Sequence, residues 1–291
     1  MENQTVISEF LLLGFSTIPN VKYVLFAIFL ISYIVTLAGN SMVIATVLNS
    51  HQLHSPMYFF LCNLSLSEIL FITNIIPKML FVTLKEGDSV SVPECISQLL
   101  IMSALTNTEC SILTVMSYDR FLAICKPLHY TSIMNWKLQL NLALWSWILS
   151  FIATLCVVLQ IYFLQFCGPS EFDHYYCDFA PIIKHSCSDT SILEMEAFLF
   201  SAPITLFPFI FIIKVFSTCS SHMAVVSMYY GSLVAIYVVP SVGHIWNINK
   251  ILSLLYTVVT PLLNPIIYSI RNQEIRMALA KFLFNRKFVD T

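Results

Sequence analysis

Two acidic residues, Glu68 and Glu109, interrupt otherwise apolar stretches of the sequence. An ionisable side chain inside a membrane span costs free energy, so such a residue is a functional candidate by default. Each acid has polar neighbours, and together with Asn40 and Asn264 the two acids could hold a cation or a proton between helices. The alternative is that each is a neutral carboxyl group bonded to a neighbouring helix. Both interpretations stay open.

A second candidate group lies at the end of another apolar stretch, where Asp119 and Arg120 follow Tyr118. An acid beside an arginine at this depth can hold the guanidinium along the membrane face until a conformational change releases it. The alternative is an arginine that simply extends to the membrane interface. For this short pattern alone, the interfacial arginine is the favoured interpretation.

A third candidate is a hinge late in the chain. Pro265 removes one backbone hydrogen bond from an apolar, helix-like segment and so predicts a bend next to Asn264. Tyr268 would move with that bend.

The cysteines indicate an oxidising compartment. Cys167, Cys177 and Cys187 crowd one predicted loop, and Cys95 opens a predicted span. Disulfides form outside the cytosol, so this loop is expected on the outer side, together with the glycosylation sequon at Asn3. Four cysteines allow three pairings, which the spacing leaves open. We interpret the remaining cysteines as small apolar packing residues: Cys62, Cys110, Cys125, Cys156 and Cys219.

The elements that carry these residues are predicted to be membrane helices. Of 291 residues, 58% are hydrophobic and only 10% are charged, whereas soluble domains carry about 25% charged residues. The net charge of -2 gives no basic field for nucleic-acid binding. A span needs about 20 mainly apolar residues. Seven segments qualify, namely 24–48, 56–77, 95–117, 138–163, 197–213, 222–240 and 251–270.

The distribution of Lys and Arg favours an extracellular N-terminus and a cytoplasmic C-terminus, because cytoplasmic loops are enriched in both residues. A basic stretch with interspersed apolar residues, 271–288, predicts a short amphipathic helix on the inner membrane surface. No repeat or long linker divides the chain, so residues 1–291 are expected to form a single domain.

Several longer motifs resemble those of one family. Residues 116–130 read MSYDRFLAICKPLHY, residues 56–67 read PMYFFLCNLSLS, and residues 261–269 read PLLNPIIYS. Gly39 with Asn40 and the run FSTCSSH at 216–222 complete the set. At matching spans, these motifs are similar to those of the odorant receptors, which belong to the rhodopsin-like G-protein-coupled receptors. The resemblance extends nearly from end to end.

The resemblance implies an all-α membrane protein with a seven-transmembrane helix bundle in the plasma membrane. It also implies the pairings Cys95 with Cys177 and Cys167 with Cys187, and no cofactor. The implied partners are a small odorant and a stimulatory olfactory-type G protein. By motif position, the switch would consist of Tyr118, Asp119, Arg120, Asn264, Pro265 and Tyr268. The ligand-binding candidates would be Met102, Ser103, Thr106 and Asn107 on span three, with Tyr230, Leu233 and Tyr237 on span six.

The sequence departs from the family at span five. Lys214 leads almost directly into the motif that opens span six, so on the order of twenty residues, one helix's worth, are missing. This leaves three hypotheses: a functional odorant receptor, a receptor-like chain whose internal deletion impairs folding or coupling, or a transporter or channel. A transporter lacks support because the two halves show no repeat. The chain also lacks the catalytic motifs HExxH and GxSxG and a phosphate loop, which argues against an enzyme.

Overall fold

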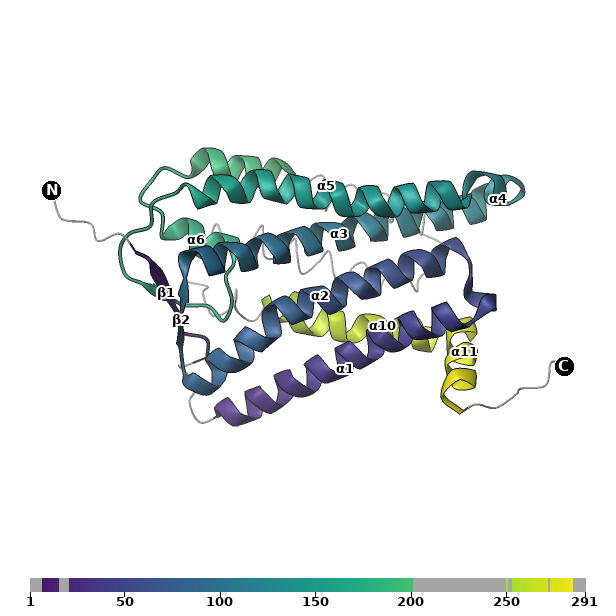
Figure 1. Cartoon of the computed structure of the whole chain (residues 1–291), viewed down its shortest axis with the longest axis horizontal. Helices are drawn as coiled ribbons and strands as arrows, with labels where there is room; N and C mark the ends of the chain where they lie inside the picture. Colours follow the sequence, from purple (N-terminus) through teal and green to yellow (C-terminus); the bar gives the residue numbers. More distant parts are fainter. Residues whose placement is uncertain (1–6, 16–20, 201–249, 251–252, 272, 285–291) are drawn as a thin grey trace.

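Four long apolar helices dominate the part of the chain that the computed structural model describes, which comprises residues 7–15, 21–200, 250, 253–271 and 273–284. Each is long enough to cross a membrane. They are α1 (Lys22–Asn49), α2 (Pro56–Lys85), α3 (Val92–Cys125) and α5 (Trp136–Tyr162). Helix α2 packs between α1 and α3, and α3 packs against α5 (Figure 1).

Local sequence signals set where these helices begin. The Ser91 side chain caps α3 by accepting a hydrogen bond from the Glu94 amide at 3.3 Å. Asn135 caps α5 in the same way through the Leu138 amide at 3.0 Å. Helix α2 starts with Pro56, whose fixed φ and missing N–H suit a first helical position. These signals set one end of α3 near the disulfide bonds, which is called the outer end of the bundle, and the ends of α2 and α5 at the opposite, inner end.

The last described segments form a further helical unit. A π-helix, η5 (Leu255–Val259), continues into α10 (Thr260–Arg271), and α10 packs against α1. Helix α11 (Gln273–Phe284) then turns away from the bundle axis (Figure 1). Ile275 anchors α11, because its side chain is buried among residues of α1, α2 and α3 near their inner ends.

Several helices extend beyond the predicted limits. Helix α2 continues past Pro77 to Lys85, and α3 continues past residue 117 to Cys125. The charged pair Asp119 and Arg120 does not end α3, because Asp119 is buried and hydrogen-bonded. The helix assigned to span five already begins at residue 191, six positions before the expected start. The rest of that span and all of span six, 222–240, lie outside the described residues.

A small sheet closes the outer end of the bundle. Strand β1 (Glu9–Leu12) lies between β2 (Asp88–Ser91) and β3 (Glu171–Phe172), antiparallel to β2 and parallel to β3. Phe10 is fully buried, with its ring 5.3 Å from that of Phe172. The N-terminal segment therefore belongs to the folded outer face.

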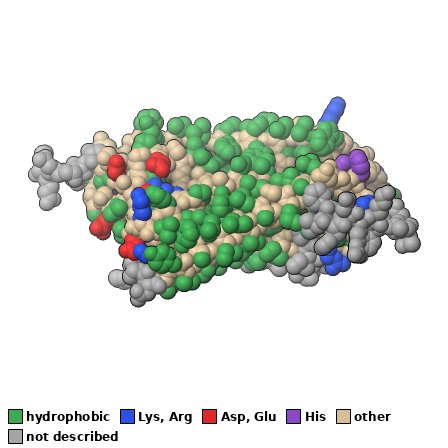
Figure 2. All heavy atoms as spheres, turned by 60° about the horizontal axis from the view of Figure 1, so that its bottom comes forward, with side chains coloured by type: hydrophobic (Ala, Val, Ile, Leu, Met, Phe, Trp, Pro, Cys, Tyr) green, Lys and Arg blue, Asp and Glu red, His purple; other side chains and the backbone are tan. Residues whose placement is uncertain are grey.

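Shorter elements shape the loops. On the inner side these are η2 (His51–Leu53), η3 (Pro127–His129) and α4 (Tyr130–Ile133), and on the outer side α6 (Phe179–Lys184). On the face that Figure 2 shows, hydrophobic side chains cover the length of the described part, while charged side chains gather toward its ends. Trp145, Leu149 and Ile152 on α5 are about half exposed, as expected for residues that face lipid.

Two buried clusters form the core, one toward each end of the bundle. The hydroxyl groups inside the spans mostly bond within their own helices: Thr36, Thr108 and Ser117 each donate to the carbonyl four residues earlier, at 2.8 Å. This satisfies their donors without a partner from another helix. The polar groups that do cross between helices therefore stand out as candidates for function.

Candidate functional site

A cavity of about 460 Å³ lies under the outer loops. All four residues predicted on span three line it: Met102, Ser103, Thr106 and Asn107. They share one face of α3, as their spacing predicts. The opposite walls come from α5, from α6 and from the helix at 191–200, and are mainly apolar. The predicted residues of span six, Tyr230, Leu233 and Tyr237, lie outside the described residues.

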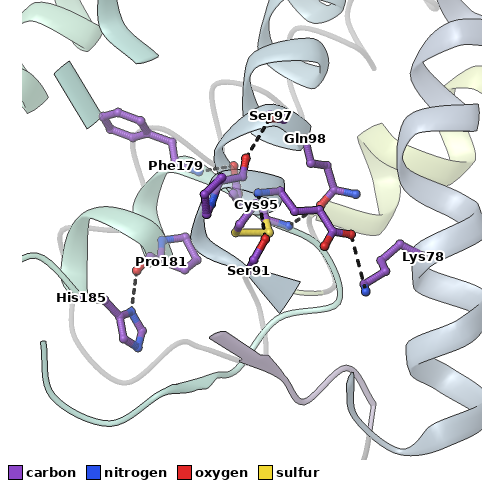
Figure 3. The surroundings of a disulfide bond; sticks show 12 residues. Lys78, Ser91, Cys95, Ser97, Gln98, Phe179, Pro181 and His185 are labelled. Carbon is purple, nitrogen blue, oxygen red and sulfur yellow. Dashed lines mark hydrogen bonds and ion pairs between the residues drawn. A yellow bond between two sulfur atoms is a disulfide. The ribbon is translucent and has the colours of Figure 1, made fainter. Parts of the chain in front are cut away.

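Two disulfide bonds fix the loop between α5 and the helix at 191–200, residues 163–190, which covers the cavity as its roof. Cys95 is joined to Cys177, with Cα atoms 5.3 Å apart, and Cys167 is joined to Cys187, with Cα atoms 5.7 Å apart. These are the pairings that the resemblance implied. Figure 3 shows the first bond beside Gln98, whose side-chain oxygen accepts a hydrogen bond from the Cys177 amide at 2.9 Å. The roof is thus attached directly to the outer end of α3.

The roof is also attached to η5, which lies within predicted span seven. Tyr176 hydrogen-bonds to Tyr256 of η5 and donates to a carboxylate oxygen of Asp178 at 3.1 Å. The hydroxyl oxygens of Tyr175 and Thr257 are 3.1 Å apart and share a hydrogen bond. Burial raises the pKa of both loop tyrosines, so their hydroxyl groups stay protonated. Asp178 and Tyr256 line the cavity, so the roof, the cavity and η5 share one hydrogen-bonded group.

Lys250 provides another attachment at the outer face. Its ammonium group donates to the Gly14 carbonyl at 3.0 Å and pairs with Asp173 at 2.5 Å. His174, the next residue, is buried against the rings of Tyr175 and Tyr176. Burial, with a smaller contribution from the charge of Lys250, lowers the pKa of His174 to about 3. This imidazole is therefore neutral at physiological pH.

A polar group lies deeper in the bundle. The Asn264 side chain of α10 donates to Glu68 of α2, and Asn40 of α1 lies beside the same carboxyl group. Gly39 permits this approach, because a Cβ at that position would lie 3.1 Å from the ring of Pro265. The structure thus brings Glu68, Asn40 and Asn264 together. Glu109 is also buried, on the neighbouring helix α3.

The inner end of α3 carries the predicted switch pair. Asp119 is fully buried and accepts a hydrogen bond from the Tyr130 hydroxyl at 2.7 Å. The Arg120 guanidinium is 3.9 Å from the other carboxylate oxygen, a longer contact. Leu128, in the turn between them and α4, is 92% exposed. The Tyr118 side chain is partly exposed, and the side chain of Tyr268 lies outside the described residues.

Comparison with known proteins identifies the family. A family model described as olfactory receptor matches residues 29–209 and 209–286. The chain belongs to the olfactory receptor family. Human olfactory receptor 6X1 is 43% identical over 97% of this chain and 96% of its own length. Human olfactory receptor 6B1 is 42% identical over 98% and 97%, and rat olfactory receptor 1468 is 38% identical over 98% of each chain.

Membership confirms the predicted fold class, a seven-helix membrane bundle, and the prediction that this olfactory receptor is a signalling protein rather than an enzyme. It is a multi-pass plasma-membrane protein that binds small-molecule odorants and couples to G proteins. The alignment with receptor 6B1 runs over 302 positions, more than the 291 residues of this chain, so this chain must carry gaps in it.

Sequence reasoning missed several residues at the olfactory receptor's sites. Tyr130 ends the motif at 116–130, yet nothing in its spacing showed that it bonds to Asp119. Tyr176, Asp178 and Tyr256 meet only through tertiary structure, across about 80 positions of sequence. An aromatic pair beside the disulfide cysteine Cys177 was the available signal for the loop contribution.

Proposed function

We propose that the receptor binds a small odorant in the outer cavity and then activates a stimulatory olfactory-type G protein at its inner face. The observation that carries the proposal is the cavity itself, which all four candidate residues of span three line. Its mixture of apolar walls and a few polar groups suits a small, mainly hydrophobic ligand. The bonds between its roof and η5 offer a physical link from the ligand to the seventh helix.

At the inner face, we propose that Asp119, Arg120 and Tyr130 form the coupling switch. Tyr130 holds Asp119, so Arg120 is only loosely paired and can turn toward a partner. Leu128 stands almost fully exposed beside this group, and an exposed leucine suits an apolar docking contact. Tyr118, Asn264, Pro265 and Tyr268 complete the proposed switch through the motion of α3 and α10.

The N-terminus is proposed to lie outside and the C-terminus inside. Carboxylates predominate at the end of the molecule that carries the disulfides, including Glu86, Asp88, Glu94, Glu171 and Asp173. Basic residues predominate at the opposite end, where Arg120, Lys126, Lys137, Arg276 and Lys281 lie. This matches the enrichment of positive charge in cytoplasmic loops. Asn3, outside the described residues, is then available for glycosylation.

Two roles remain proposed for Glu68 and Glu109, with Asn40 and Asn264: a site that holds a cation or a proton between helices, or neutral carboxyl groups that bond to a neighbouring helix, as Glu68 would to Asn264. Both Glu68 and Asn264 have a buried oxygen without a hydrogen-bond partner in the described structure, which suits a bound cation. A sodium titration of receptor melting temperature separates the two roles. Sodium-dependent stabilisation that Glu68→Gln removes supports the cation site. Sodium-independent melting, unchanged by Glu68→Gln, supports the protonated contact.

A second candidate is a receptor whose internal deletion impairs folding or coupling. The two family-model matches meet at residue 209, near the shortened segment, and the longer alignments need gaps in this chain. The inner ends of spans five and six carry much of the G-protein contact in the family. Cell-surface staining separates misfolding from failed coupling, because only the latter leaves the receptor at the surface.

The test uses cells that express the full chain, an odorant panel and a cAMP readout, with staining of the N-terminus. An odorant response that Arg120→Ala abolishes supports the proposed function. Filling the cavity with Ala153→Trp should abolish the same response while leaving surface staining intact, since Ala153 lines the cavity. A response that survives Ala153→Trp contradicts the proposed binding site.

A further inference from the structure

The polar wall of the outer cavity on the helix side already uses most of its hydrogen-bond donors. The Thr106 hydroxyl donates to the Met102 carbonyl at 3.0 Å, and the Thr154 hydroxyl donates to the Ser150 carbonyl at 2.8 Å. An amide hydrogen of Asn107 points to the Thr154 oxygen at 3.0 Å. Because a hydroxyl has a single proton, neither threonine has a hydrogen left to donate to a ligand.

At the loop end of the cavity, the hydrogen-bond donors also already bond to partners within the receptor. Tyr176 donates its proton to Asp178, so in its bond with Tyr256 it must be the acceptor. The Tyr256 proton is therefore committed to Tyr176. The second carboxylate oxygen of Asp178 accepts from the Phe179 amide at 2.8 Å. These hydrogens point toward Asp178, which accepts them in its ionised form. Burial raises the pKa of Asp178, whereas the hydrogen bonds from the Phe179 amide and the Tyr176 hydroxyl favour the carboxylate and oppose that rise.

Among the residues that the structure describes, Asp178 has no cationic partner at the cavity. Lys184 and Glu194 also line the cavity, but both are exposed and carry opposite charges. Asp178 is more enclosed, and within the described part of the chain no lysine or arginine forms an ion pair with it. A carboxylate offers about four acceptor positions. Two are occupied, by Phe179 and Tyr176, which leaves room for a donor from a ligand.

We propose that Asp178 binds a hydrogen-bond donor group of the odorant, so that the receptor selects alcohols and amines over ethers with the same number of heavy atoms. This inference rests on the proposed function, because it requires the odorant to occupy the outer cavity. The helix side contributes acceptors and the adaptable Ser103 hydroxyl, while the remaining walls accommodate the hydrocarbon part. An ether lacks a hydrogen for Asp178 and leaves the carboxylate desolvated, which is costly.

The test measures ligand binding without a G protein, by melting of the purified full-length receptor in lipid nanodiscs. The probes are sets of volatile compounds matched in their number of heavy atoms: a primary alcohol, the corresponding primary amine and the methyl ether of the alcohol that is one carbon shorter. A hydrogen bond to a charged group predicts an affinity for alcohol and amine at least about tenfold above that of the ether. Equal affinities within each set would overturn the proposal.

Two variants test the assignment to Asp178. Asp178→Asn keeps an oxygen for the Phe179 amide but introduces hydrogens at the other position, so the preference should fall to within about threefold. Glu171→Gln removes one charge from the same outer loop away from the cavity and should retain the full preference. A full preference in Asp178→Asn contradicts the assignment. If Asp178→Asn does not fold, Tyr256→Phe provides the second test, because it leaves Asp178 intact and frees the Tyr176 oxygen to accept from a ligand. The preference should then persist or rise, and its loss would contradict the assignment.

The cavity-filling variant distinguishes failure of this inference from failure of the proposed function. If Ala153→Trp removes all binding but ethers bind the wild-type receptor as well as alcohols do, only the donor preference is wrong. If binding survives Ala153→Trp, the cavity is not the odorant site and both proposals fall. Absence of any melting shift across the matched sets contradicts both as well.

Discussion

Tyr130 and His174 contact buried partners at opposite ends of the receptor. Tyr130 joins the inner loop to a buried carboxylate, Asp119, at 2.7 Å. His174 packs between tyrosine rings in the outer loop, 4.7 Å and 4.5 Å from their centroids. Neither residue was selected by sequence reasoning, because a tyrosine and a histidine in loops are common and their buried partners come from tertiary contacts.

Replacing Tyr130 with Phe should impair coupling while leaving odorant binding unchanged. The substitution removes a hydrogen bond to a charged group, worth about 1.5 to 3 kcal/mol, and lets Asp119 pair more closely with Arg120. We expect the maximal cAMP response to fall by more than about half, with an unchanged odorant-induced melting shift. Tyr162→Phe, at an exposed outer position, is the matched control. Equal responses in the two variants would rule out this role.

Acidification should destabilise the outer loop through His174. Its folded pKa, about 3, lies below the ordinary value of 6.5, so the unfolded chain binds a proton first as the pH falls. Stability is therefore highest above pH 6.5 and declines below it, by about 2 kcal/mol at pH 5. The pKa of Asp88 is lowered by its Lys78 partner, so its contribution is lost only at still lower pH.

Melting curves of the wild-type receptor and of His174→Phe test this pH dependence between pH 7.5 and 5. The variant keeps an aromatic ring in the cluster but cannot titrate, so comparison with it cancels the contributions of other groups. The wild type should lose more stability than the variant over this interval. Parallel pH profiles would show that His174 is not the responsible group.

At the scale of elements, the long helices were predictable and their exact ends were not. Hydropathy indicates a span wherever about 20 apolar residues follow one another, and α1 (Lys22–Asn49) includes the expected 24–48. Helix α3 continues past Asp119 because burial and a hydrogen bond offset that charge, which hydropathy cannot show. Strand β1 has four residues and depends on pairing with β2 and β3, so no local pattern predicted it.

The candidate site, too, was predictable only in part from the sequence. The four positions on α3 could be placed from motif and helical spacing, because they follow one another on one helix face. The contribution of Tyr256 depends on η5, a π-helix that shifts the register of side chains, and on a roof loop distant in sequence. Such contacts between distant parts of the sequence could be identified only in the three-dimensional structure.

The packing of α1 against α10 depends on Gly39. A larger side chain there would meet the Pro265 ring, since even a Cβ comes within 3.1 Å, and would push α10 away from α1. We expect Gly39→Val to destabilise the receptor by about 1 to 3 kcal/mol and to reduce its surface expression. Ala38→Val adds a similar volume at an exposed position and should have little effect. Comparable melting temperatures of the two variants would contradict this packing role.

At the scale of the whole molecule, the described outer end contrasts with a sequence that is shortened near span five. The outer half has its disulfides, roof and cavity in place. The family-model matches meet at residue 209, where the sequence shortens span five and the inner loop. In the proposed function, ligand binding depends on the outer cavity and coupling on the inner segments, so we expect the two activities to be separable by experiment.

Restoring the missing segment should reveal the contribution of the inner half. Inserting the end of span five and the third inner loop of an aligned relative, such as human olfactory receptor 6B1, adds back contacts for a G protein. We expect the maximal cAMP response to rise, with the odorant concentration for half-maximal binding unchanged. A response no larger than that of the unaltered chain would show that the shortening does not limit coupling.

The most direct test of the central claim is odorant-dependent cAMP production in cells that carry the unaltered chain at their surface. We expect a concentration-dependent response that Arg120→Ala abolishes and that Ala153→Trp removes without loss of surface staining. A receptor that reaches the surface and binds odorant, yet produces no cAMP with any compound of the panel, would contradict the claim that this chain signals.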